Sequence, residues 1–184
     1  MGKKWYEQSG KQGDVIVSTR VRLARNLKEY PFPCRLDSTQ REEVAKKIQE
    51  ALLHSNSAIA DSFQFINMQQ MSEEEAVSLV ERHIVSPEFA SDRQGRYLLL
   101  TADETVGIMI NEEDHIRIQV MSQGLELAGV YDMADKIDTL LDHALGFAFD
   151  EKLGYLTQCP TNLGTGMRAS LMLHLPALQH SKAI

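Results

Sequence analysis

The chain has 184 residues, of which 43% are hydrophobic and 24% charged, a composition typical of a globular protein with one core. Its formal net charge is −7, which argues against a general nucleic-acid-binding protein because such proteins present a basic surface. No apolar run is long enough to span a bilayer, and residues 1–13 contain no apolar signal-peptide core, so neither a membrane span nor a secretory leader is expected.

The two cysteines, Cys34 and Cys159, stand far apart, and neither belongs to a CxxC motif. This predicts free thiols in a reducing compartment, the cytoplasm, rather than a disulfide framework. No segment rich in proline, serine or glycine divides the chain, so we expect residues 1–184 to belong to one domain.

Residues 1–13 are polar and are predicted to form a loose lead-in, whereas residues 14–25 alternate as a β-strand does. One face of this strand carries Val17, Thr19, Val21 and Leu23, and the other carries Ser18, Arg20, Arg22 and Ala24. Arg20 and Arg22 would project in parallel, about 7 Å apart by strand rise, which suits a polyphosphate with many acceptors in a row. A solvated strand face explains the same two arginines equally well.

Two capping boxes predict helix starts, one at Thr39–Glu42 and one at Ser72–Glu75. Between them, residues 63–68 are predicted to form a short strand. The second helix carries an apolar stripe that ends at His83. A single histidine in that place is more often structural than functional.

An apolar hairpin is predicted from residues 96–101 and 105–110. The acidic residues 112–114 follow directly and indicate a turn or bulge, because like charges repel within a sheet. In an extended run Glu113, His115 and Arg117 would share a face, so that a carboxylate and an arginine line one cleft. An acidic turn followed by an ordinary amphipathic strand is the alternative.

Residues 125–141 have the apolar spacing of a helix that covers a sheet, and residues 153–158 and 168–175 are predicted to form a short strand and a half-buried strand. The glycine-rich segment between them contains Cys159 and ends at Arg168, so it could hold a reactive thiol beside a phosphate. A buried cysteine in a glycine-rich turn is the alternative. The order of elements predicts an α+β fold with a mostly antiparallel sheet flanked by helices.

Three segments, Ser18–Arg22, Asn111–Arg117 and Cys159–Ser170, together resemble the phosphagen (guanidino) kinase family, and the resemblance covers nearly the whole chain. Arg82–Pro87 and Met172–Leu178 resemble the bacterial protein-arginine kinase branch of that family. The resemblance implies a kinase that transfers the γ-phosphoryl group of ATP, with Mg²⁺, to arginine side chains of a protein substrate. It further implies that the product is marked for a Clp-type protease, and an activator protein is a further expected partner.

The resemblance also implies roles for individual residues. Glu113 would bind the substrate guanidinium, Cys159 would lie close to it, and His83 would pack near the nucleotide base. The residues implied to bind ATP are Ser18, Thr19, Arg20, Val21, Arg22, His83, Arg117, Arg168, Ala169, Ser170, Leu171 and Met172.

The chemistry of such a reaction fits these residue types. A guanidinium stays protonated in proteins, so an acceptor nitrogen needs a carboxylate that orients it and takes a proton. The transferring phosphoryl group spreads negative charge that fixed arginines can stabilise. The chain has neither a Walker A motif nor the glycine-rich loop of protein kinases, so the arginines must replace them, and Mg²⁺ is expected to bridge the phosphates with few protein ligands.

The family pattern continues into a mobile glycine-rich loop, with another nucleotide-binding arginine and a second acidic residue, that is not found in these 184 residues. We therefore expect an incomplete, C-terminally truncated catalytic domain whose open sheet edge favours a homo-oligomer. Two alternatives to the protein-arginine kinase stay open: a small-molecule guanidino kinase that acts on free arginine, and a non-catalytic nucleotide-binding or regulatory fragment.

Overall fold

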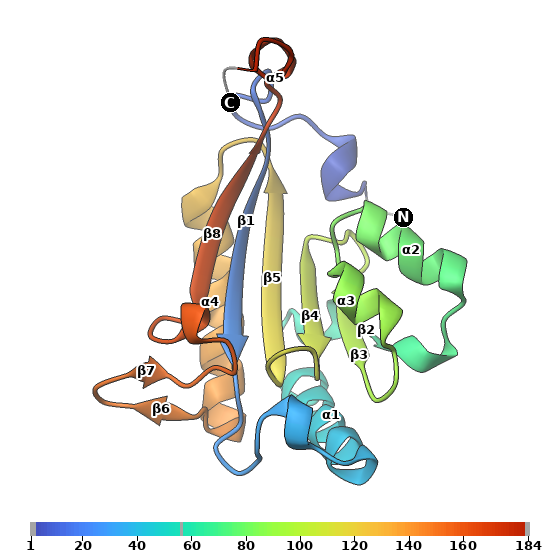
Figure 1. Cartoon of the computed structure of the whole chain (residues 1–184), viewed down its shortest axis with the longest axis vertical. Helices are drawn as coiled ribbons and strands as arrows, with labels where there is room; N and C mark the ends of the chain where they lie inside the picture. Colours follow the sequence, from blue (N-terminus) through green and yellow to red (C-terminus); the bar gives the residue numbers. More distant parts are fainter. Residues whose placement is uncertain (1–2, 56, 183–184) are drawn as a thin grey trace.

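The computed structural model describes residues 3–55 and 57–182, and its centre is one six-stranded sheet in the order β2-β3-β4-β5-β1-β8 (Figure 1). Every neighbouring pair of strands in this sheet is antiparallel, which confirms the predicted α+β class. The strands are β1 (Ile16–Arg25), β2 (Phe63–Asn67), β3 (Tyr97–Thr101), β4 (Val106–Ile110), β5 (Ile116–Gln123) and β8 (Met167–Leu173).

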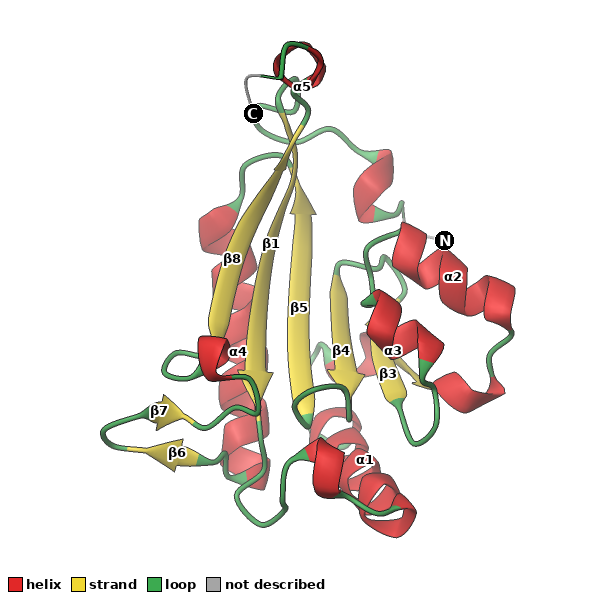
Figure 2. Cartoon of the chain, in the orientation of Figure 1, coloured by secondary structure: helices red, strands yellow, loops and turns green. Residues whose placement is uncertain are grey.

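Two long helices, α1 (Ser38–Leu53) and α4 (Leu127–Leu145), cover one face of the sheet. The helix α4 packs against β1 and β5, and in Figure 2 it is seen behind β8 and β1. Side chains of both helices and of the central strands form the main core, which includes Val44, Ile48, Ile108, Ile118, Val21 and Ile137. The predicted helix over residues 125–141 is thus confirmed, although Leu127 and Tyr131 are exposed.

The other face is covered only in part, by α2 (Glu73–Glu81) and α3 (Pro87–Ser91). Leu79 and Phe89 from these helices join Leu98 and Met109 in a second core over β3 and β4. Met109 stands opposite Arg117 of β5, and directly opposed residues share a face of the sheet. The same face is therefore open over β5, β1 and β8, and the candidate site lies there.

The remaining elements are small. A hairpin of β6 (Phe149–Asp150) and β7 (Gly154–Tyr155) projects beside the end of β1, and α5 (Pro176–His180) follows β8. Short 3₁₀ turns span Trp5–Glu7, Pro33–Arg35, Ala60–Ser62, Met68–Gln70 and Pro160–Asn162. Over residues 3–55 and 57–182 no helix is both long and apolar enough to cross a membrane.

Two helix starts test the capping predictions. The box at Ser72 is confirmed, since the Glu75 amide donates to the Ser72 hydroxyl (3.2 Å) and the Ser72 amide donates to the Glu75 carboxylate (2.9 Å). The box at Thr39 was wrong, because Asp37 caps α1 and Gln40 reciprocates. Asp and Gln serve these positions as well as Thr and Glu do, so the helix begins earlier than predicted.

The prediction of a loose lead-in was wrong for residues 3–13, and residues 1 and 2 lie outside the described part of the chain. Trp5 is 5% exposed, and its amide donates to the carbonyl of Asp103 at 3.3 Å. Lys4 Nζ lies 2.7 Å from the buried carboxylate of Glu104, which Arg82 also contacts. The N-terminal segment is therefore tied to the turn between β3 and β4.

Two strand predictions also needed correction. Only Gly154–Tyr155 of residues 153–158 is a strand, namely β7. The strand predicted at residues 168–175 exists as β8, but most of its side chains are exposed rather than half-buried. The reason is that β8 is the last strand of the sheet and pairs only with β1 among the described residues, so its outer edge is open.

Candidate active site

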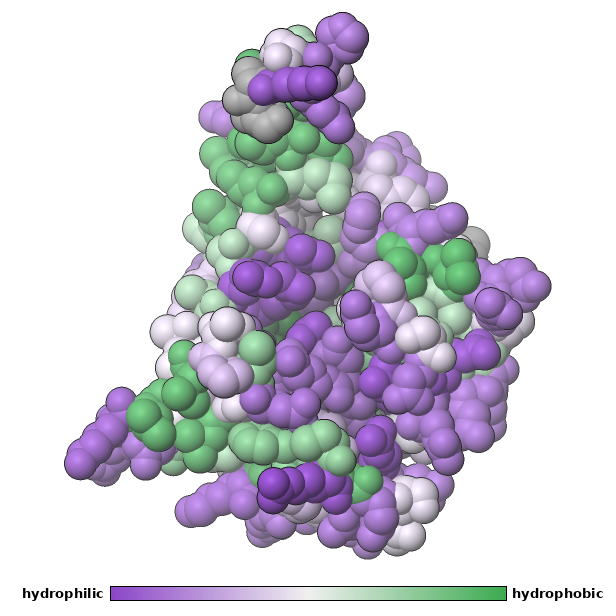
Figure 3. Space-filling model, in the orientation of Figure 1, coloured by the Kyte–Doolittle hydropathy of each residue, from purple (hydrophilic) through white to green (hydrophobic). Residues whose placement is uncertain are grey.

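Four arginines meet on the open face of the sheet. Arg22 of β1 stands opposite Arg168 of β8, and Arg20 stands opposite Ser170. Arg117 enters from β5, in register with Ala24. The predicted parallel projection of Arg20 and Arg22 is confirmed by this register, and Figure 3 shows hydrophilic residues gathered over the middle of this face.

The arginines repel one another. Burial, followed by repulsion from Arg20, Arg117 and Arg168, lowers the pKa of Arg22 to about 10. Burial and then repulsion from Arg168 and Arg117 lower the pKa of Arg20 as well. Within the part of the chain that the structure describes, only Arg117 of the four forms an ion pair, and the Nε of Arg22 is buried without a hydrogen-bond partner. An anion with several oxygens would relieve this repulsion.

The acidic turn between β4 and β5 places a carboxylate beside Arg117. Glu113 Oε2 lies 3.2 Å from Arg117 Nη2. The neighbouring Glu112, which sequence reasoning gave no role, lies 2.9 Å from the same nitrogen, and its side chain is only 7% exposed. Glu112 also accepts from the hydroxyl of Ser86 (2.9 Å) and from the Glu113 amide (3.0 Å). Glu112 therefore fixes the guanidinium of Arg117, while Glu113 is left more accessible.

The acidic turn begins with a residue whose backbone adopts the left-handed conformation. Asn111 has a φ of 61°, and its side-chain amide donates to the carbonyls of Arg41 (2.9 Å) and Gly95 (3.0 Å). Asn adopts this conformation more readily than most residues.

Burial raises the pKa of the Glu113 carboxyl, and the nearby Arg117 opposes that rise. A carboxylate whose pKa is raised is a better proton acceptor.

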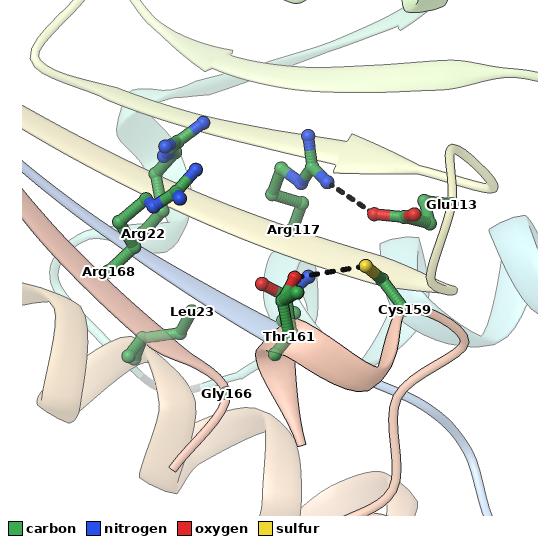
Figure 4. A pocket seen from close by; sticks show the side chains of 10 residues that line it. Arg22, Leu23, Glu113, Arg117, Cys159, Thr161, Gly166 and Arg168 are labelled. Carbon is green, nitrogen blue, oxygen red and sulfur yellow. Dashed lines mark hydrogen bonds and ion pairs between the residues drawn. The ribbon is translucent and has the colours of Figure 1, made fainter. Parts of the chain in front are cut away.

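The thiol loop, defined here as residues 158–166, forms the other wall. Cys159 Sγ lies 3.0 Å from the Thr161 hydroxyl, and Figure 4 shows the thiol on the side of the cleft that faces Glu113. Buried Asp114 joins the loop to the acidic turn, since it accepts from the Gln158 amide (2.8 Å) and from the Asn26 side chain (2.6 Å).

These walls enclose a cleft of about 230 Å³. The predicted residues Arg22, Glu113, Arg117, Cys159 and Arg168 all line it. Its other lining residues are Leu23, Ala24, Thr161, Asn162 and Gly166. A carboxylate, a thiol and three guanidinium groups thus share one cavity, although they come from three separate parts of the sequence.

His115 does not share this cleft, so the predicted common face of Glu113, His115 and Arg117 was wrong. His115 is fully buried; its Nδ1 accepts from the Leu27 amide (3.0 Å), and its Nε2 lies 3.0 Å from the Pro31 carbonyl. Burial lowers its pKa to about 4. The turn interrupts the strand alternation before β5 begins at Ile116, which turns His115 into the protein.

A second cavity of about 430 Å³ lies at the other end of β1 and β8. Its lining includes Trp5, Tyr6, Ile16, His83 and Met172 and is largely apolar. His83 lies beyond the end of α2 with a φ of 60°, so its predicted place on the helix face was wrong. The burial of Trp5 in this wall was missed, although it is the single tryptophan of the sequence.

The other predicted nucleotide residues divide by strand face. Ser18 lies on the side of Arg20, and the Ser170 hydroxyl accepts from Arg20 Nε at 3.3 Å. Thr19 and Val21 turn toward α4: the Thr19 hydroxyl donates to the Gly124 carbonyl (2.6 Å) and accepts from the Glu126 amide (3.1 Å). Ala169 and Leu171, the partners of Val21 and Thr19 on β8, share that side.

Clustered arginines suit the oxygens of a phosphate group, and the carboxylate beside them suits a cationic group. Comparison with known proteins agrees. Residues 43–184 match the model of the ATP:guanido phosphotransferase C-terminal catalytic domain. The chain belongs to the ATP:guanido phosphotransferase family.

Similar curated proteins include the protein-arginine kinase of Caldanaerobacter subterraneus subsp. tengcongensis, 47% identical over 90% of this chain and 49% of that protein. The protein-arginine kinase of Brevibacillus brevis is 45% identical over 98% of this chain and 50% of that protein. The chain thus spans about half the length of the curated relatives it matches.

Solved structures of the family have the same fold. The substrate-free duplicated taurocyamine kinase of Schistosoma mansoni gives a TM-score of 0.79 at 34% identity over 91% of this chain and 25% of that one. Lombricine kinase gives a TM-score of 0.78 at 26% identity over 91% of this chain and 50% of that one.

Proposed function

We propose that this chain carries the phosphate clamp and the acceptor site of a kinase that transfers the γ-phosphoryl group of ATP to arginine side chains in proteins. The observation that supports this most strongly is the meeting of Arg22, Arg117 and Arg168 with Glu113 and Cys159 in one cleft. Arginine forks suit phosphate oxygens, and a carboxylate suits a guanidinium.

The nucleotide would lie along the open face. His83 and Met172 line the largely apolar cavity that would take the base, and Arg22 lines the cleft that would take the terminal phosphates. Ser18 and Arg22 are four residues apart on β1, or about 13 Å by strand rise. The order along β1, from the apolar cavity to the arginines, matches the order of base and phosphates in a nucleoside triphosphate.

In the proposed reaction Glu113 accepts a proton from the acceptor guanidinium while that nitrogen bonds to the γ-phosphorus. The bond from the γ-phosphorus to the β,γ-bridging oxygen breaks, and ADP leaves. The arginines stabilise the charge that spreads over the transferring group. Alignment by fixed side chains contributes the other large part of such a rate enhancement.

ATP would enter as its Mg²⁺ complex, in which the ion neutralises phosphate charge. Carboxylate oxygen is a ligand that Mg²⁺ accepts, and Glu112 and Glu113 are the carboxylates beside Arg117. Both oxygens of Glu112 are already engaged. Glu113 is assigned to the acceptor guanidinium, so most ligands of the ion would come from phosphate and water.

A protein acceptor is favoured over a small one because the curated relatives at 42–47% identity are named protein-arginine kinase. The small-molecule alternative has its own support, since similar structures are taurocyamine and lombricine kinases. The wider setting proposed here comes from the sequence resemblance to the protein-arginine kinase branch: the cytoplasm, an activator protein and a Clp-type protease that receives marked substrates. The open edge of β8 supports self-association, as open sheet edges do.

The test is a competition assay. The purified chain is incubated with Mg·ATP and equal concentrations of free arginine and an arginine-rich protein, and phosphoarginine is quantified by mass spectrometry under conditions that preserve the P–N bond. Phosphoarginine on the protein, absent with Glu113→Gln, is the expected result. Phosphorylation of free arginine alone would contradict the proposed acceptor, and ATP binding with no transfer to either would favour the non-catalytic alternative.

A further inference from the structure

One arginine of β1 lies behind the cleft rather than in it. Arg25 is 3% exposed and does not line the cavity. Its Nη2 donates to Oδ2 of Asp138 on α4 at 2.9 Å, and its Nε lies 2.9 Å from Oδ1 of the same carboxylate. Asp138 is itself buried. Burying an ion pair costs desolvation free energy, so packing alone does not account for a charged pair at this place.

The rest of the Arg25 guanidinium is directed at the thiol loop. Nη1 donates to the carbonyl of Thr165 (3.0 Å) and to that of Ala24 (2.8 Å). The guanidinium carbon lies 3.6 Å from the centre of the Tyr155 ring, within the range of a cation–π contact. A single side chain therefore joins α4, β1, β7 and the loop.

Gly166 shows how closely the loop approaches Arg25. Its φ is +59°, and a Cβ built there would lie 2.5 Å from Arg25 Nη1 and 2.6 Å from the Ala24 carbonyl oxygen. The Gly166 carbonyl accepts from the Ala24 amide at 2.8 Å. The backbone is thus seated directly on the guanidinium, and only glycine leaves room for it.

We propose that Arg25 and Asp138 are a positioning pair that sets the thiol loop against β1, and with it the distance between Cys159 and Arg168. The pair lies outside the cleft and contacts Thr165 and Gly166, which stand in the chain between Cys159 and Arg168. The position of Thr165 and Gly166 on Arg25 therefore determines where Cys159 and Arg168 lie. The chemical consequence rests on the function proposed above, whereas the structural claim does not.

Arginine is required for this role rather than positive charge alone. The planar fork meets one carboxylate and two carbonyls at once and stacks on a ring, which a lysine ammonium cannot do. Arg25→Lys therefore keeps the charge and loses the geometry, whereas Asp138→Asn keeps the shape and loses the partner charge. Arg20→Lys is the matched control, since Arg20 lies on the same strand and contacts Ser170 rather than the thiol loop.

Hydrogen exchange measured by mass spectrometry locates the effect. We expect amides of residues 154–166 to exchange at least tenfold faster in Arg25→Lys and Asp138→Asn, while those of residues 97–110 and those of the control stay within twofold. Equally faster exchange in residues 154–166 and 97–110 would show that the pair only stabilises the whole fold. Unchanged exchange in both segments would show that the pair does not position the thiol loop. Should both variants fail to fold by circular dichroism, Gly166→Ala, which pushes the loop off an intact pair, decides between the same outcomes.

Two further measurements separate positioning from nucleotide binding. In a Cys34→Ser background, the alkylation rate of Cys159 should rise at least fivefold in Arg25→Lys, because the thiol loses its contact with Thr161. The dissociation constant of Mg·ADP should rise less than tenfold, since Arg168 moves with the loop, whereas Arg20, Arg22 and Arg117 lie outside it. An unchanged alkylation rate would overturn the proposal. Failure of the parent chain to bind nucleotide would instead count against the proposed function and leave the exchange result intact.

Discussion

Arg22 is predicted to lower the free energy of unfolding of the unliganded protein, because its guanidinium lies beside other arginines and no bound anion offsets their repulsion. Burial and the neighbouring arginines lower its pKa to about 10, and each pKa unit corresponds to about 1.4 kcal/mol, so the charged form is disfavoured by up to about 3 kcal/mol. Arg22 is only half-buried, and solvent screening reduces this figure. We therefore expect a net penalty of about 1–2 kcal/mol.

Replacing Arg22 by Met keeps an unbranched apolar stem and removes the guanidinium charge. The melting temperature of the unliganded chain should rise by about 2–8 °C, since 1 kcal/mol corresponds to about 2–4 °C for a chain of this size. Mg·ATP should stabilise the parent chain more than the variant. Salt should raise the melting temperature of the parent more than that of the variant, because screening weakens the repulsion.

The assay is thermal unfolding followed by circular dichroism, with and without Mg·ATP, at low and high salt. Arg35→Met is the matched control, because Arg35 is exposed and makes no ion pair within the described residues, and it should leave the melting temperature unchanged. A lower melting temperature for unliganded Arg22→Met would refute the reasoning, since it would show that Arg22 stabilises the fold.

Three further predictions follow from the site. Glu113→Gln should lower transfer by about 10²–10⁴-fold, the usual contribution of a general base, while the dissociation constant of Mg·ATP measured by calorimetry changes less than threefold; a similar loss of binding would assign Glu113 to the nucleotide instead. His115 should be neutral in the folded chain, because its pKa is about 4 there against 6.5 in the unfolded chain. Its contribution to the free energy of unfolding should therefore be complete above pH 6.5 and decrease as the pH drops toward 4. Urea unfolding of His115→Gln should show a smaller decrease over this range, and equal decreases in parent and variant would contradict the prediction. Trp5 fluorescence should respond to Mg·ATP and not to tripolyphosphate, which has no base, and a response to both would place the base elsewhere.

Much of the framework follows from local sequence. The hairpin of β3 and β4, the helix α4 and the parallel projection of Arg20 and Arg22 depend on periodicity and turn residues that lie within a few positions of one another. The grouping of the three site segments was expected from resemblance to a family. The structure places residues from each of them, Arg22, Glu113 and Cys159, in one cleft.

Features that depend on distant partners could not be predicted in this way. Trp5 is ordered by the turn at Asp103, and β8 is exposed because of its place in the sheet rather than its own alternation. His115 is buried because the turn at Asn111 resets the strand phase. The roles of Arg25 and Glu112 arise only from tertiary contacts.

The central claim is that one cleft brings together a nucleotide's phosphate and an arginine guanidinium. Calorimetric titration of an arginine-containing peptide into the chain, in the presence of Mg·ADP and nitrate, tests it most directly, because planar nitrate resembles a transferring metaphosphate. We predict that Mg·ADP and nitrate together tighten peptide binding at least tenfold, that neither does so alone, and that Glu113→Gln abolishes the effect. Peptide affinity that is independent of both would contradict the claim, because it would place the guanidinium away from the phosphates.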